Sequence, residues 1–89
     1  MTRYVACPDT ASATVAGGMV VLHMGTKRYY SLNETGAELW RLLETGTTIA
    51  LATDWLARSY EVTQTEASRA AERLIRDLLI ENLVAEAEA

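Results

Sequence analysis

The chain has few of the residues on which enzymes, disulfide-bonded domains and metalloproteins depend. Among its 89 residues there is one cysteine, Cys7, and one histidine, His23. A single cysteine cannot form an internal disulfide, which favours a reducing cytoplasm. One histidine and one cysteine fall short of the three or four ligands that zinc usually needs, so we expect no metal site. A catalytic dyad would need a nucleophile beside His23, and nothing in the sequence indicates that Cys7 reaches it.

Long apolar runs and excess positive charge are also lacking. No stretch approaches the roughly 18 consecutive apolar residues of a membrane span, and the first nine residues contain no apolar run typical of a signal peptide. The formal net charge is −4, a poor match to the basic surface of a nucleic-acid binder. The glycines form no phosphate-binding motif. Glu34 and Glu38 are more typical of a solvated helix flank than of acid–base catalysis. We therefore expect a cytoplasmic protein that is not an enzyme, needs no cofactor and contacts neither membrane nor nucleic acid.

The sequence does contain the pattern of a small sheet in its first half. Hydrophobic residues make up 49% of the chain, enough for one compact domain over residues 1–89. Residues 1–11 are weakly patterned and predict an N-terminal arm. Runs of strand-forming residues at 12–16, 19–24 and 28–32, separated by glycine-containing turns, predict a three-stranded antiparallel sheet within residues 12–32.

From Asn33 onward the spacing of apolar residues becomes helical. Asn33 is suited to cap a first helix, Gly46 to end it, and Thr47 or Thr48 to cap a second. Thr63 and Glu66 have the spacing of a capping box, which opens a third helix that runs to about residues 81–82. Three helices within residues 33–84 and a frayed tail at 85–89 complete an α+β domain of the winged helix-turn-helix type.

The third predicted strand carries two adjacent tyrosines, which point to opposite faces because side chains alternate along a strand. We expect one of them to pack beneath the helices with Leu32 and the other to stay near the surface. Packing alone is the commoner role of tyrosines in a small sheet. The alternative is that the strand is an open edge to which an extended peptide adds by β-augmentation. The candidate binding residues on this strand are Lys27, Arg28, Tyr29, Tyr30, Ser31 and Leu32.

The third helix is the candidate for the second wall of a peptide groove. Ala70, Arg73 and Asp77 share a flank at i, i+3 and i+7, and Leu74 adjoins them on the core face. Ala70 is small enough to leave room for a bulky side chain, and Arg73 could pair with a carboxylate of the guest peptide. An ordinary solvated flank is an equally good interpretation of these residues.

The stretch that joins the third strand to the first helix resembles the PqqD-like family, the recognition domains for precursor peptides of ribosomally made natural products. The resemblance covers roughly residues 12–84, and its specific part is Tyr30-x-x-Asn33-Glu34-Thr35-Gly36-Ala37-x-x-Trp40. Within the family the chain is most similar to the small free-standing proteins of lasso-peptide pathways. The resemblance implies binding of a precursor's leader segment on the third strand and against the third helix. It also implies two partners, a transglutaminase-like leader peptidase and, less directly, an asparagine-synthetase-like cyclase.

The hairpin between the second and third predicted strands departs from the family pattern. The family commonly has an acidic residue where His23 stands and a glycine where Lys27 stands. Here a glycine occurs at Gly25 instead, which leaves the strand register at the 25–27 turn open.

The preferred interpretation is a non-catalytic adaptor, or peptide chaperone, that captures a leader segment and delivers it to processing enzymes. A rival is a winged-helix DNA-binding regulator, favoured by Arg69, Arg73 and Arg76 along one side of the third helix. Four acidic residues on the same helix oppose that rival, because they cancel the attraction to phosphates. A third possibility is a fold-stabilising subunit of an enzyme complex, whose sheet edge is permanently paired with its partner.

Overall fold

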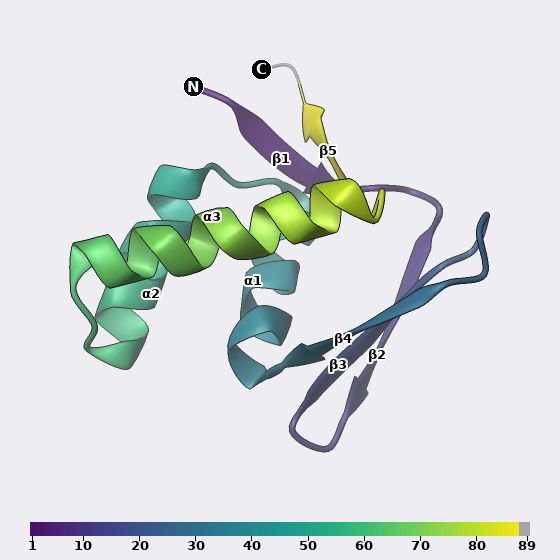
Figure 1. Cartoon of the computed structure of the whole chain (residues 1–89), viewed down its shortest axis with the longest axis horizontal. Coiled ribbons are helices and arrows are strands. Elements are labelled where there is room, and N and C mark those ends of the chain that lie inside the picture. The colour runs from purple at the N-terminus through teal and green to yellow at the C-terminus, as the bar shows by residue number, and fades with distance from the viewer. Residues whose placement is uncertain (88–89) are drawn as a thin grey trace.

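The chain folds around a three-stranded antiparallel sheet and three helices. A computed structural model describes residues 1–87. Figure 1 shows the sheet on one side of α1 and the α2–α3 pair on the other. The sheet has the order β2-β3-β4, so the predicted α+β fold is confirmed. The elements in chain order are β1 (Arg3–Ala6), β2 (Thr10–Val15), β3 (Gly18–His23), β4 (Tyr29–Asn33), α1 (Glu34–Thr45), α2 (Ile49–Tyr60), α3 (Gln64–Ile80) and β5 (Val84–Ala87).

The two ends of the chain form a second, two-stranded sheet that the sequence did not indicate. β1 pairs antiparallel with β5, from Arg3 opposite Ala87 to Ala6 opposite Val84, and both lie side by side at the top of Figure 1. The expected arm is therefore partly a strand, and the expectation that residues 85–89 fray is wrong for 85–87. Residues 88–89 lie outside the described residues. Strands of four residues give almost no periodic signal, and their partners stand at opposite ends of the sequence.

The turn between β3 and β4 is held together by His23. Its imidazole Nδ1 accepts hydrogen bonds from the backbone N–H of Gly25 at 3.1 Å and of Thr26 at 3.2 Å. Lys27 completes the turn with a φ of 64°, the left-handed conformation that glycine adopts most easily. The register is thereby settled, with Leu22 opposite Tyr29. β4 begins one residue later than predicted.

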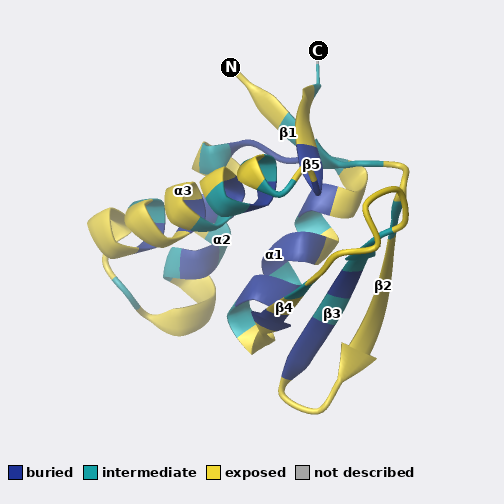
Figure 2. Cartoon of the chain, turned by 45° about the vertical axis from the view of Figure 1, so that its right-hand side comes forward, coloured by how far each residue is buried: buried dark blue, intermediate teal, exposed yellow. Residues whose placement is uncertain are grey.

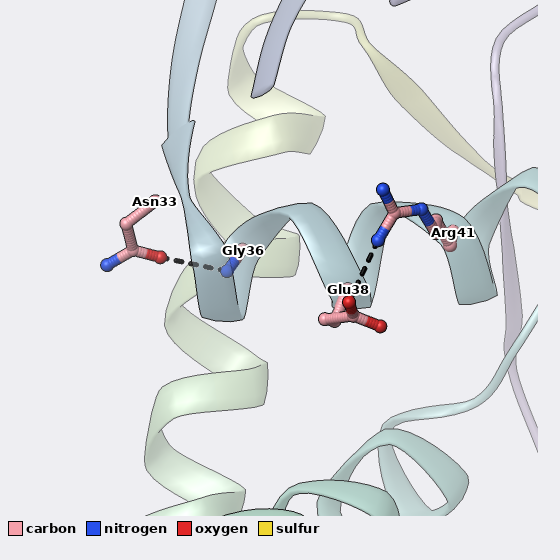
Figure 3. A network of polar contacts seen from close by, with 4 residues as sticks. All are labelled: Asn33, Gly36, Glu38 and Arg41. Carbon is pink, nitrogen blue, oxygen red and sulfur yellow. Dashed lines mark hydrogen bonds and ion pairs between the residues drawn. The ribbon is translucent and has the colours of Figure 1, made fainter. Parts of the chain in front are cut away.

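β4 passes into α1 without a loop, and Asn33 makes the junction. It is the last residue of the strand and the N-cap of the helix, as predicted. Its side-chain Oδ1 accepts a hydrogen bond from the N–H of Gly36 at 2.9 Å (Figure 3). Figure 3 also shows the exposed ion pair of Arg41 with Glu38, which are 2.8 Å apart on the outer surface of α1. The cap fixes the first turn of α1 directly beside β4.

The predicted caps of the other two helices and the glycine that ends α1 are also confirmed, whereas α3 ends one to two residues earlier than predicted. Thr48 caps α2 and Thr63 caps α3, each with a side-chain oxygen that accepts a backbone N–H three residues on. Gly46 ends α1, and its φ of 98° is in the region that favours glycine. α3 ends at Ile80. None of the helices in the described chain is long and apolar enough to cross a membrane.

The core lies where the sheet, α1 and α3 meet. Trp40 and Leu43 of α1 pack there against Ile75 and Leu78 of α3 and against Val21 of β3. A second cluster joins α1, α2 and α3. Figure 2 shows β3 in the colours of buried and intermediate residues and the inner side of α1 as largely buried, whereas β2 is exposed from Ala11 to Val15. The helices therefore cover only one face of the sheet, and they leave β4 beside α1.

Candidate functional site

β4 is an edge strand, because the sheet has the order β2-β3-β4. The backbone N–H of His23 donates to the carbonyl of Arg28 at 2.8 Å. Residues along an antiparallel strand alternate between groups that face the partner strand and groups that face away. Because His23 and Arg28 form such a bonded pair, Tyr30, two residues further along β4, also directs its backbone N–H and C=O toward β3. Tyr29 and Ser31 direct theirs outward, away from β3. Within residues 1–87 no strand pairs with this outward edge.

A cavity of about 320 Å³ lies beside the free edge of β4. Three elements enclose it: the end of β4, the first two turns of α1 and the middle of α3. The junction without a loop at Asn33 brings the first two of these together. The lining residues are Tyr30, Ser31, Leu32, Asn33, Thr35, Gly36, Leu39, Ala70, Arg73, Leu74 and Asp77. We call this cavity, together with the outward edge of Tyr29 and Ser31, the β4–α3 groove.

The floor of the groove is apolar and its rim is polar. Leu32 and Leu39 are buried, and the half-buried Leu74 packs against both core clusters. Ala70 is exposed on α3 and presents only a methyl group to the opening. Arg73 is exposed at the rim. An extended chain on the β4 edge could therefore place apolar side chains on this floor while its backbone pairs with the strand.

The end of the groove nearest the β3–β4 turn is acidic. Burial raises the pKa of the Tyr30 phenol above its usual value of 10.0, and the nearby carboxylates of Asp77 and Glu81 raise it further. The phenol therefore stays protonated at neutral pH and keeps its O–H as a hydrogen-bond donor. Arg28, the residue before β4, reaches to Glu81, the C-cap residue of α3, with 3.5 Å between the charged atoms. This exposed ion pair links the strand to the helix across the end of the groove.

The family model for "Coenzyme PQQ synthesis protein D (PqqD)" matches residues 18–84 of the chain, a segment that includes β4, α1 and all of α3. The chain belongs to the PqqD family. No match is found among curated proteins. The PqqD-family protein is similar to the solved structure described as TbiB1 in complex with the TbiA(beta) leader peptide, with a TM-score of 0.84 and 25% sequence identity over 96% of this chain and 99% of that one. It is also similar to a lasso peptide synthetase B1 complexed with the leader peptide, with a TM-score of 0.82 and 28% identity over 92% of this chain and 96% of that one.

The structure of this PqqD-family protein brings most of the predicted site residues together in one groove. The three that do not line its cavity are Lys27, Arg28 and Tyr29. Lys27 lies in the turn and donates its N–H to the carbonyl of His23, so it has no backbone donor left for a guest. Tyr29 is 73% exposed, whereas Tyr30 is half-buried against the core. The prediction that the two tyrosines divide between surface and core is confirmed.

The first two turns of α1 were missing from the predicted site. Thr35, Gly36 and Leu39 line the groove beside Asn33. Gly36 packs so closely that a Cβ there would stand 3.2 Å from the Leu32 side chain. The signal was present in the sequence, because a strand that runs directly into a capped helix must place the first turn of that helix beside itself.

β2 is the other edge of the three-stranded sheet, but it offers less to a guest. Residues 11–15 are all exposed, so neither face of that strand is covered by the rest of the domain. β4, in contrast, has Leu32 in the core and α3 beside its edge. Backbone pairing alone gives little selectivity, because every peptide carries the same backbone groups. The β4 edge is therefore the better candidate for selective binding.

Proposed function

We propose that this PqqD-family protein is a non-catalytic adaptor that binds the leader segment of a ribosomally made precursor, of the lasso-peptide type. The leader adds as a strand to β4 and lies against α3. The observation that carries the proposal is the outward N–H and C=O of Tyr29 and Ser31 beside a cavity with an apolar floor. Two similar solved structures, at 25% and 28% identity, are complexes with leader peptides, which supports the same guest class here.

The apolar floor is needed to reach a useful affinity. Each backbone hydrogen bond to the guest contributes about 0.5–1.5 kcal/mol, and ordering a disordered peptide costs about 2–5 kcal/mol. Backbone bonds to Tyr29 and Ser31 therefore only offset the ordering cost. Each apolar side chain buried on Leu32, Leu39 and Leu74 adds about 1.5–3 kcal/mol. Selectivity and affinity thus come from the same contacts.

Cys7 and His23 are the side chains best suited to perform chemistry, and their surroundings do not favour it. Burial raises the pKa of the Cys7 thiol and the negative charge of Asp9 raises it further, whereas a nucleophilic cysteine needs a lowered pKa. His23 is engaged in the β3–β4 turn through Nδ1. The adaptor acts instead by recruitment in the cytoplasm. By holding the leader near a transglutaminase-like peptidase, and near an asparagine-synthetase-like cyclase, it raises the local concentration of substrate.

The DNA-binding alternative has weaker support from the charges. Arg73 lines the groove together with Asp77, and Glu66 and Glu72 lie on the same helix as the arginines. The formal net charge of −4 further opposes binding to phosphates.

Reversing the charge of Arg73 is expected to weaken leader binding. Among the described residues that line the cavity, Arg73 is the one basic side chain, and Arg73→Glu removes it and adds a carboxylate near Asp77. We expect the Kd for a fluorescently labelled leader peptide, measured by polarisation, to rise about tenfold or more.

Arg76→Glu is the matched control for this experiment. Arg76 is exposed on the same helix but does not line the groove, and its reversal changes the net charge equally. We expect its Kd to stay within about twofold of the original protein, a difference well below the roughly 1.4 kcal/mol of a tenfold change. Equal affinities for the two variants would rule out the β4–α3 groove as the binding site.

A further inference from the structure

The strand β2 forms the second open edge of the three-stranded sheet, and it lacks the features by which edge strands avoid association. Within residues 1–87 no strand pairs with its outer side, and residues 11–15 are exposed (Figure 2). Edge strands of monomeric proteins are commonly protected by a charged side chain, a proline, a bulge or a covering segment. The pairing of β2 with β3 has no bulge, and the sequence from Thr10 to Thr26 contains neither a charged side chain nor a proline. This edge is therefore open to another strand.

The hydrogen bonds of the β2–β3 hairpin determine which backbone groups of β2 face outward. The N–H of Met24 donates to the carbonyl of Asp9 at 2.8 Å, so the backbone of Asp9 faces β3. Inward and outward residues alternate along an antiparallel strand, so Ala11, Ala13 and Val15 also face β3. The residues between them direct their backbone N–H and C=O groups outward, and they are Thr10, Ser12 and Thr14. An added strand has to bond to these three residues.

The sequence of this edge reads the same in both directions. The segment Thr10-Ala11-Ser12-Ala13-Thr14 is a palindrome, so an antiparallel pair of two copies centred on Ser12 places residues of the same type opposite each other. This register also gives every outward-facing residue an outward-facing partner, with Ser12 opposite Ser12 and Thr10 opposite Thr14. Each such pair exchanges two backbone hydrogen bonds, and cross-strand threonine and serine pairs add favourable side-chain contacts. A second copy of this chain therefore complements the edge without any pocket.

The surroundings of β2 leave room for the second copy. The helix α1 packs over β3 and β4, and two cavities, of about 310 and 260 Å³, lie between α1 and β2. Thr10 and Ser12 line the larger of these cavities, so their side chains are not enclosed by the helix. The two-fold axis through Ser12 also places Asp9 of the two copies at opposite ends of the pair. The acidic side chains nearest to the strand therefore do not oppose each other.

We propose that two copies of this protein associate through β2 and form a dimer with a continuous sheet of the order β4-β3-β2-β2-β3-β4. This inference goes beyond the proposed function and does not depend on it. The two β4 strands lie at the outer edges of the joined sheet, so each copy keeps its β4–α3 groove accessible. A strand of six residues on each side is smaller than the roughly 20–30 residues a side of a stable interface. We therefore expect a weak dimer whose fraction depends on protein concentration.

The first test compares Ser12→Lys with Ser68→Lys by sedimentation equilibrium, from about 10 μM to about 1 mM protein. Both variants replace serine by lysine and change the net charge equally, but Ser12 lies on the two-fold axis and Ser68 lies on α3. For the original protein we expect the mean mass to rise with concentration from one chain toward two. Ser12→Lys places like charges directly opposite each other, so its dimer Kd is expected to rise about tenfold or more. Ser68→Lys is expected to stay within about twofold of the original.

Two double variants test the register of the pair. In the register centred on Ser12, Ala11 of one copy lies opposite Ala13 of the other. Ala11→Lys combined with Ala13→Lys opposes like charges, and we expect this variant to stay monomeric although it lowers the net negative charge. Ala11→Lys combined with Ala13→Glu opposes unlike charges, and we expect it to dimerise at least as tightly as the original. Thermal melts check that all variants are folded.

Three results would overturn the proposal. The first is an original protein that remains monomeric at every concentration, and the second is a Ser12→Lys variant that dimerises as tightly as Ser68→Lys. The third is equal dimer affinity of the two double variants, which would show that Ala11 and Ala13 do not face each other across the axis. None of these results involves leader binding, so the proposed function would be unaffected by them.

Discussion

Ser31→Pro is expected to weaken leader binding by about 10- to 100-fold and to leave the protein folded. Ser31 is exposed in the edge strand β4, and its N–H faces outward, where proline is tolerated in a sheet. The substitution removes a donor that the guest strand needs, and the proline ring occupies the position of the guest backbone. Fluorescence polarisation with a labelled leader measures the affinity, and a thermal melt measures the fold.

Tyr30→Pro is the control, one position along the same strand. Its N–H faces β3 opposite Val21, so proline there breaks a bond of the sheet itself. We expect this variant to lose about 2–4 kcal/mol of unfolding free energy. If Ser31→Pro bound the leader as well as the original protein, or if it unfolded more readily than Tyr30→Pro, the assignment of inward and outward groups on β4 would be wrong.

Gly18→Ala is expected to remove about 2–4 kcal/mol of stability, a large part of the 5–15 kcal/mol available to a small domain. Gly18 is the first residue of β3 and stands opposite Asn33 of β4. A Cβ on Gly18 would overlap the backbone carbonyl oxygen of Leu32, which belongs to the strand and cannot rotate away. The two strands must separate where β4 meets α1, and the groove opens with them. Urea unfolding followed by circular dichroism gives the free energy.

Gly17→Ala is the matched control for this change, because Gly17 precedes Gly18 in the same turn. A Cβ at Gly17 would meet nothing within 4 Å, although its φ of 79° still disfavours alanine. The expected cost is about 1 kcal/mol, from backbone strain alone. A cost for Gly17→Ala that equals or exceeds that of Gly18→Ala would show that the close approach to Leu32 is not what requires glycine at position 18.

The local parts of the fold were predictable because they depend on side chains a few residues apart. Asn33 and Gly36, or Thr63 and Glu66, are close enough in sequence for the cap to be recognised directly. The β1–β5 sheet was not predictable, because neither strand has a periodic pattern and the pairing joins the two ends of the chain. The turn at 25–27 was left open for a related reason. Its geometry depends on the His23 ring accepting two backbone N–H groups, a role that an apolar strand does not suggest.

The candidate groove was partly predictable from the alternation of strands and the spacing of helices. Those two periods place Tyr30 and Leu32 on the inner side of β4, and Ala70 and Asp77 on one flank of α3. The sequence could not show that these surfaces face each other, since that depends on how α3 packs across α1. It also could not show which backbone groups of β4 point outward. That follows only from the observed register with β3.

Amide hydrogen exchange along β4, followed by NMR with and without a leader peptide, tests the central claim most directly. The N–H groups of Tyr29 and Ser31 should exchange rapidly in the free protein and become protected when leader is added. Those of Tyr30 and Leu32 should be protected in both states, because they already pair with β3. Leader binding that leaves the Tyr29 and Ser31 amides as exchangeable as before would contradict strand addition at this edge.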